Sequence, residues 1–215
     1  MKHNIIPRII IYAAGLFLMA FGVAFSVNSN LGVSPVNSLP YVVSRILKVD
    51  LGRCVIAVFS GYILIQILLL RRNFRWINLT QLLFSTAFGY FVDLAKWIVG
   101  DFALPTYGGQ LMMLTISIFL VAAGVCLYMD VKLINMPMEG MTHAVKEVLL
   151  PNKSFHEAKV IMDSLSVAVG VVLSLVFLGR LEGIREGTVI CALLVGKVMK
   201  PMQKLLKPLV EKACR

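Results

Sequence analysis

Two aspartates within long apolar stretches, Asp93 and Asp163, are the residues of this sequence best placed to carry protons. An acidic side chain is costly in lipid, so each is a candidate for ion or proton coupling. Each also has a lysine at helical spacing, since Lys96 follows Asp93 by three residues and Lys159 precedes Asp163 by four. A structural ion pair on one helix is therefore the alternative for both aspartates.

A second set of polar residues surrounds two prolines, Pro35 and Pro137, which suit the first turn of a helix because the missing N–H leaves no bond unmade there. Two residues after each proline stands a side chain that could bind a solute, Asn37 or Glu139. We predict short helices at 35–49 and 137–149 that break inside the protein and line a polar cavity. The candidate substrate-binding residues are Asn30, Ser34, Asn37, Met136, Glu139, Glu186 and Thr188.

Each of these assignments has a structural alternative. The two short helices could lie flat at the membrane interface and keep their charged residues in water: Arg45, Lys48, Lys146 and Glu147. Glu186 and Thr188 stand where the last apolar stretch begins, and there they could simply cap a helix.

The sequence holds no arrangement typical of catalysis. It contains no G-x-S-x-G, no H-E-x-x-H and no P-loop, and no serine or histidine is spaced to set a nucleophile beside a base. We therefore expect no enzymatic activity, no cofactor and no metal site.

The elements that hold these residues must be membrane helices. Of the 215 residues, 59% are hydrophobic and 15% are charged, and the mean hydropathy is +0.85. A water-soluble domain carries about a quarter charged residues, so soluble enzymes, nucleic-acid binders and disordered proteins are excluded. Windows of about 19 residues predict spans at 9–27, 55–70, 79–98, 110–129 and 160–178, and a sixth at 187–199 that contains Lys197.

The net charge of +10 follows from orientation in the membrane. With six spans and both termini in the cytoplasm, 15 of the 21 lysines and arginines fall on the cytoplasmic side, counting from Lys2 and Arg8 to the basic tail that ends at Arg215. This asymmetry is the one that the positive-inside rule expects. The charge therefore gives no reason to expect a nucleic-acid partner.

The chain also repeats itself. A shift of 102 residues aligns 17–47 with 119–149 and gives nine identities in 31 positions, among them Gly22 with Gly124 and Pro35 with Pro137. Each half, 1–104 and 105–215, then has three spans and one short Pro-led helix. Because three is an odd number of crossings, the two copies must face opposite ways, an arrangement typical of secondary transporters.

Two motifs resemble those of the YczE/YyaS/YitT family of bacterial integral membrane proteins. Residues 31–39 (LGVSPVNSL) are similar to its LG-SP-WDVL signature, and residues 185–196 (REGTVICALLVG) are similar to its GEGT-ISALLVG end. The family's Trp-Asp is Val36-Asn37 here, which makes Asn37 a weaker candidate for charge chemistry, whereas Asp93 matches the acid that closes the family's corresponding helix. The resemblance implies a multi-spanning protein of the bacterial inner membrane that transports small solutes.

We therefore expect an all-α polytopic membrane protein with six transmembrane helices in two inverted three-helix repeats. The expected function is that of a small secondary transporter or permease for a small organic solute, with a site at the midplane between the repeats. Two alternatives stay open: the substrate-binding subunit of an energy-coupling-factor vitamin importer, and a non-transporting membrane regulator or chaperone. The expected partners are the solute and the lipid bilayer, and a homodimer is left open.

Overall fold

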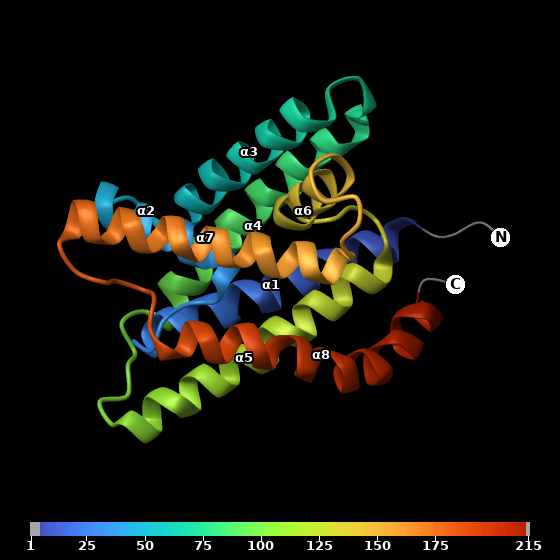
Figure 1. The fold of residues 1–215 in the computed structure, drawn as a ribbon. Helices are drawn as coiled ribbons and strands as arrows, with labels where there is room; N and C mark the ends of the chain where they lie inside the picture. The colour runs from blue at the N-terminus through green and yellow to red at the C-terminus, as the bar shows by residue number, and fades with distance from the viewer. Residues whose placement is uncertain (1–4, 214–215) are drawn as a thin grey trace. The chain divides into compact units, whose positions relative to one another are not determined.

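The computed structural model describes residues 5–213, and all of the regular structure within them is helical (Figure 1). Lys2 and Arg215, which the charge count assigns to the cytoplasm, lie outside this range. The helices are α1 (Ile5–Asn28), α2 (Pro35–Leu47), α3 (Leu51–Leu70), α4 (Thr80–Val99), α5 (Tyr107–Val131), α6 (Pro137–Val148), α7 (Phe155–Leu178) and α8 (Glu186–Ala213), with short 3₁₀ turns at Arg71–Asn73 and Trp76–Leu79.

Five segments are long and apolar enough to cross a membrane: Ile5–Asn28, Leu51–Asn73, Trp76–Val99, Tyr107–Val131 and Glu157–Leu178. They coincide with the first five predicted spans to within a few residues at each end. The sixth predicted span is not among them. It forms the start of α8, whose 28 residues continue through Pro201 and Pro208.

The two Pro-led helices also form, and each begins at its proline. In α2 and α6 the first six residues are buried or half-buried, whereas the exposed side chains come later, from His143 onward in α6 and from Arg45 onward in α2. The half of each helix that follows the proline is therefore enclosed by protein, and the charged end reaches the surface.

The chain forms two compact units, and each unit takes helices from both halves of the sequence. The first unit comprises Met1–Ser34, Phe91–Leu133 and Gly183–Arg215, and so contains α1, α5 and α8. The second comprises Pro35–Tyr90 and Ile134–Glu182, and so contains α2, α3, α6 and α7. Helix α4 contributes residues 80–90 to the second unit and the remainder to the first. The two compact units therefore do not coincide with the two sequence repeats, which meet between residues 104 and 105.

In the first unit, α1 and α5 pack antiparallel. Arg8 near the start of α1 donates to the carbonyl oxygen of Val131 at the end of α5, at 2.6 Å, and Ser117 donates to the carbonyl of Gly22, also at 2.6 Å. The helices approach so closely that a Cβ on Gly124 would lie 2.5 Å from the main-chain oxygen of Gly15. Small residues are what permits such an approach.

Helix α8 runs parallel to α5 along most of its length. Near its start, Cys191 packs with Leu114 and Ile118 of α5. Further along, Cys126 Sγ lies 3.6 Å from the Met199 carbonyl oxygen, and Gln203 Nε2 donates to Asp130 Oδ1 at 2.6 Å. Residue numbers therefore increase in the same direction along both helices.

In the second unit, each Pro-led helix packs against a long helix from the other half of the sequence. Helix α2 packs on α7 as well as on α3, and α6 packs on α3 as well as on α7. Phe59 of α3 stacks on Phe88 of α4 in the core, with ring centroids 6.2 Å apart. This packing brings polar side chains of α3, α4 and α7 to the first turn of α6.

Candidate functional site: a polar cluster at the first turn of α6

Glu139 and Asp163, which the sequence assigned to separate tasks, share one lysine. Lys159 Nζ lies 3.3 Å from Asp163 Oδ1 and 3.9 Å from Glu139 Oε1. The three side chains keep between 17% and 28% of their surface exposed. The local pair of Lys159 with Asp163, weighed above as the alternative, therefore exists, but it belongs to a three-residue group with a net charge of −1.

The geometry of α7 explains how two of these residues come to lie together. Ser154 caps the helix by accepting from the Glu157 N–H, and the Glu157 carboxylate accepts from the Ser154 N–H in return. From this fixed start, Lys159 and Asp163 stand four residues apart and share one helix face. Glu139, in the first turn of α6, is favoured by the partial positive charge of that helix end.

A pair of glutamines completes the polar surroundings of α6. Gln66 Nε2 donates to Gln81 Oε1 and to the Pro137 carbonyl, both at 3.1 Å, and both glutamine side chains are buried. Gly140 leaves them room, because a Cβ there would lie 2.6 Å from Gln66 Oε1. The amides thus connect α3 and α4 to the first turn of α6.

One further polar contact lies deeper along α7. The Tyr62 hydroxyl and Ser166 Oγ are 3.2 Å apart and buried. Ser166 is three residues beyond Asp163, so Lys159, Asp163 and Ser166 lie along one face of α7. Sequence reasoning did not find Tyr62, Gln66, Gln81 or Ser166. A lone glutamine inside the apolar run of α3 was the one available signal, since an amide there needs a buried partner.

The two family-like motifs pack against each other within the first unit. The Gly187 N–H donates to the Leu31 carbonyl at 2.7 Å, and a Cβ on Gly187 would lie 2.6 Å from that oxygen. Gly32, at φ +109°, passes Thr188 so closely that a Cβ would lie 2.7 Å from Thr188 Oγ1. Thr188 Oγ1 accepts from the Arg185 N–H at 3.4 Å.

These contacts give Thr188 the capping position that was weighed as its alternative role. Glu186 is exposed and pairs with its neighbour Arg185 at 3.1 Å. Asn30 is exposed too, and its carbonyl accepts from Arg185 Nη1 at 3.1 Å. Their assignment to substrate binding stays a prediction, as does that of the half-buried Ser34.

The remaining predicted residues lie in different surroundings. Asp93 is half-buried in α4, and Lys96 Nζ on the same helix donates to Asn28 Oδ1 at 2.9 Å. Asn37 and Met136 are buried at the starts of α2 and α6. Met136 directly precedes the proline of α6, and its assignment to substrate binding stays a prediction, as does that of Asn37 and the coupling role of Asp93.

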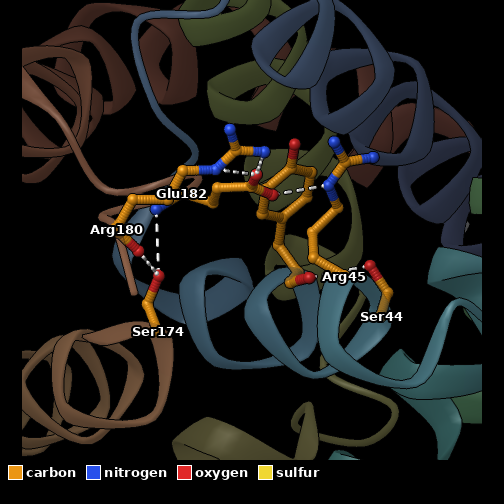
Figure 2. A network of polar contacts seen from close by, with 6 residues as sticks. Ser44, Arg45, Ser174, Arg180 and Glu182 are labelled. Atoms are coloured by element: carbon orange, nitrogen blue, oxygen red, sulfur yellow. Dashed lines mark hydrogen bonds and ion pairs between the residues drawn. The ribbon is translucent and has the colours of Figure 1, made fainter. Parts of the chain in front are cut away.

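A separate polar network, which sequence reasoning missed, ties the end of α7 to α2 (Figure 2). Glu182 Oε2 accepts from Arg45 Nε at 2.8 Å, and Oε1 accepts from Arg180 Nε at 2.8 Å. Ser174 donates to the Arg180 carbonyl at 2.6 Å and accepts from the Glu182 N–H at 3.0 Å. The hydrogen bond from Arg45 holds the pKa of Glu182 below its ordinary value.

Burial raises the pKa of Tyr41, beside which Arg45 lies with its guanidinium carbon 5.9 Å from the ring centre. Both carboxylate oxygens of Glu182 accept hydrogen bonds from arginines in this network. The network therefore closes the turn after α7 and attaches it to α2. Among the side chains that the structure describes, which leave out His156 and the two chain ends, no three His, Cys, Asp or Glu come together in a way that could hold a metal ion.

Comparison with known proteins agrees with the two motifs. A family model described as "Family of unknown function (DUF6198)" matches residues 6–204. The chain is similar to the uncharacterized membrane protein YczE of Bacillus subtilis (strain 168), with 25% identity over 203 residues that cover 93% of this chain and 87% of the relative. No solved structure matches. The resemblance to the YczE group is confirmed, and the relative together with the five apolar helices identifies a membrane protein.

Proposed function

The chain belongs to this family of unknown function, and we propose that it is a small secondary transporter or permease whose solute binds at the polar cluster around the first turn of α6. The observation that carries the proposal is the group formed by Glu139, Lys159 and Asp163, half-buried among apolar helices. Charged side chains within membrane helices are costly and commonly mark solute or ion pathways. We propose transport without chemical conversion of the solute.

The charge of the cluster suggests the class of solute. Two carboxylates and one ammonium leave a net charge of −1, and the neighbouring glutamines offer both donors and acceptors. A small organic solute with an amino group would complement this set by competing with Lys159 for the carboxylates. Asp163, which would lose its partner in that exchange, is the residue that we propose for proton coupling.

Two features of the packing support an inverted repeat. The equivalent helices α1 and α5 run antiparallel, as a two-fold axis in the membrane plane requires. The cross-packing is reciprocal, since α2 packs on α7 while α6 packs on α3. Under this proposal the cluster lies between the repeats, because α3 and α4 come from the first and α6 and α7 from the second.

The parallel run of α8 beside α5 supports a sixth crossing. Because α5 is long and apolar enough to cross a membrane, a helix that follows it from Leu114 to Asp130 would pass through much of the same depth. We propose that Lys197 and Lys200 extend their ammonium groups to the cytoplasmic headgroups, as lysines near helix ends do. Six crossings put both termini on the cytoplasmic side of the inner membrane.

The proposal is tested on the purified protein with a panel of amines, amino acids, thiols and vitamins. We expect one or more amines to raise the melting temperature and to be taken up by proteoliposomes. Glu139→Gln should abolish both effects, and Glu147→Gln, at the exposed end of the same helix, should leave them intact. If no compound in the panel binds, or if the two variants behave alike, the cluster is not the binding site.

A further inference from the structure

The second half of α8 carries a stripe of four lysines: Lys197, Lys200, Lys204 and Lys207. At 100° per residue their side chains fall within an arc of about 80° on one side of the helix. All four are exposed. We call this surface the lysine stripe.

Another side of the same helix, about 100° around the axis from the middle of the stripe, is occupied by protein. The Met199 carbonyl lies against Cys126, Gln203 bonds to Asp130, and Val210 keeps only 4% of its surface exposed. The orientation of α8 about its own axis is therefore fixed by α5, and the lysine stripe lies on a side that protein does not cover.

The contact between Gln203 and Asp130 also indicates the depth of the stripe. The apolar span of α5 ends at Val131, one residue after Asp130, so residues 204–213 of α8 follow the level at which that span ends. Two further cations mark the same end, because Arg8 donates to the Val131 carbonyl and Lys132 follows it. This end of the first unit is thus basic where it leaves the apolar layer.

Two large apolar side chains on a third side of α8 have no protein to cover them. Leu205 is 66% exposed and Leu209 is 60% exposed. They project about 80° and 120° from Lys197 around the helix, nearly opposite Lys200 and Lys207, so they form an apolar ridge separate from the stripe. A helix with lysines on one side and exposed leucines on another has the pattern of a segment lying in the headgroup layer.

We propose that the lysine stripe binds the headgroups of anionic phospholipids, while Leu205 and Leu209, on another side of the same helix, contact the acyl chains. Each lysine near an anionic surface contributes about 1 kcal/mol, which three lysines convert into about two orders of magnitude in affinity. Binding of the lysine stripe to the headgroups fixes the end of α8, and with it α5, relative to the bilayer. This inference does not depend on the transport proposal.

The test uses the full-length protein in a zwitterionic detergent, with the melting temperature followed while phosphatidylglycerol or phosphatidylcholine is added. We expect phosphatidylglycerol to stabilise the protein at a lower concentration than phosphatidylcholine does. The triple variant Lys200→Gln, Lys204→Gln, Lys207→Gln should need about a hundredfold more phosphatidylglycerol. The matching triple replacement by arginine keeps the charges and should keep the affinity.

The control removes the same number of charges elsewhere, as Lys48→Gln, Arg53→Gln, Lys153→Gln at exposed positions of the second unit. It should retain the preference for phosphatidylglycerol. An equal loss in this control would reduce the effect to overall charge and overturn the proposal. So would full stabilisation by soluble glycerol phosphate, since that result would identify a site for small anions that needs no acyl chain.

Discussion

Replacing Lys159 by methionine should destabilise the protein far more than neutralising either of its acidic partners. The lysine is the shared cation of the cluster, at 3.3 Å from Asp163 and 3.9 Å from Glu139. Without it, both half-buried carboxylates lose the cation that they share. Without Glu139, by contrast, the closer pair of Lys159 and Asp163 is still intact.

The magnitude follows from the distances. At an effective dielectric constant of about 20, charges 3.3 and 3.9 Å apart attract by about 5 and about 4 kcal/mol. The exposed fractions of 17% to 28% admit solvent and reduce both values, as does the desolvation that the cluster already bears. We expect Lys159→Met to cost about 2–4 kcal/mol, or about 5–15 °C in melting temperature, and Glu139→Gln to cost less than about 1 kcal/mol.

The assay is thermal unfolding of the purified protein in detergent at neutral pH. Lys153→Met is the matched control, because Lys153 pairs with Glu157 at 3.7 Å with both side chains at least half exposed. That pair should contribute less than about 1 kcal/mol. Removing all three charges with Lys159→Met, Glu139→Gln, Asp163→Asn should restore most of the melting temperature, since uncompensated charge rather than lost packing is the cause.

Two results would refute this reasoning. If Lys159→Met is no more harmful than Lys153→Met, the cluster is too well solvated for its charges to matter. If the triple variant stays as unstable as Lys159→Met alone, the lysine stem contributes by packing and the shared ion pair is not what stabilises the site.

Three further predictions concern the packing and the polar network. Gly187→Ala should cost about 1–3 kcal/mol by pushing against the Leu31 carbonyl, whereas Gly61→Ala, with nothing within 4 Å, should be neutral or stabilising in a melting experiment. Gly124→Leu should separate α1 from α5 and cost at least as much as Gly187→Ala by the same assay. Because its pKa is lowered in the fold, Glu182 contributes stability above its ordinary pKa of 4.5 and loses it as the pH falls through the lowered value. The melting temperatures of the wild type and Glu182→Gln should therefore differ at pH 6 and converge in acid.

Much of the fold could be predicted from the sequence because its elements are set by local properties. The five apolar spans follow from the lengths of uncharged runs, and the starts of α2 and α6 follow from Pro35 and Pro137. The length of α8 could not be predicted in this way. Its lysines and its prolines at 201 and 208 favour an early end, and contacts with α5 as far along as Gln203 support the longer helix.

The candidate site was predictable only in part, because its members come from helices that lie far apart in the sequence. The cost of a carboxylate in lipid singled out Asp163, and its place after Pro137 singled out Glu139, but Lys159 was considered only as a local partner of Asp163 and not as a cation that both carboxylates share. Gln66 and Gln81 carry no charge, and their bond to each other and to Pro137 joins three separate helices. Such a group becomes visible only when the tertiary structure brings its members together.

The difference between the repeats and the units has a physical basis. A Pro-led helix of 12 or 13 residues is too short to be covered by its own repeat alone. For α6 part of the cover is α3 from the other half of the sequence, whose Gln66 donates an additional hydrogen bond to the Pro137 carbonyl. Each Pro-led helix thus packs on a long helix of the other half, and the compact unit contains both. The polar cluster forms at this exchange, because Gln66 and Gln81 reach the same first turn of α6 that carries Glu139.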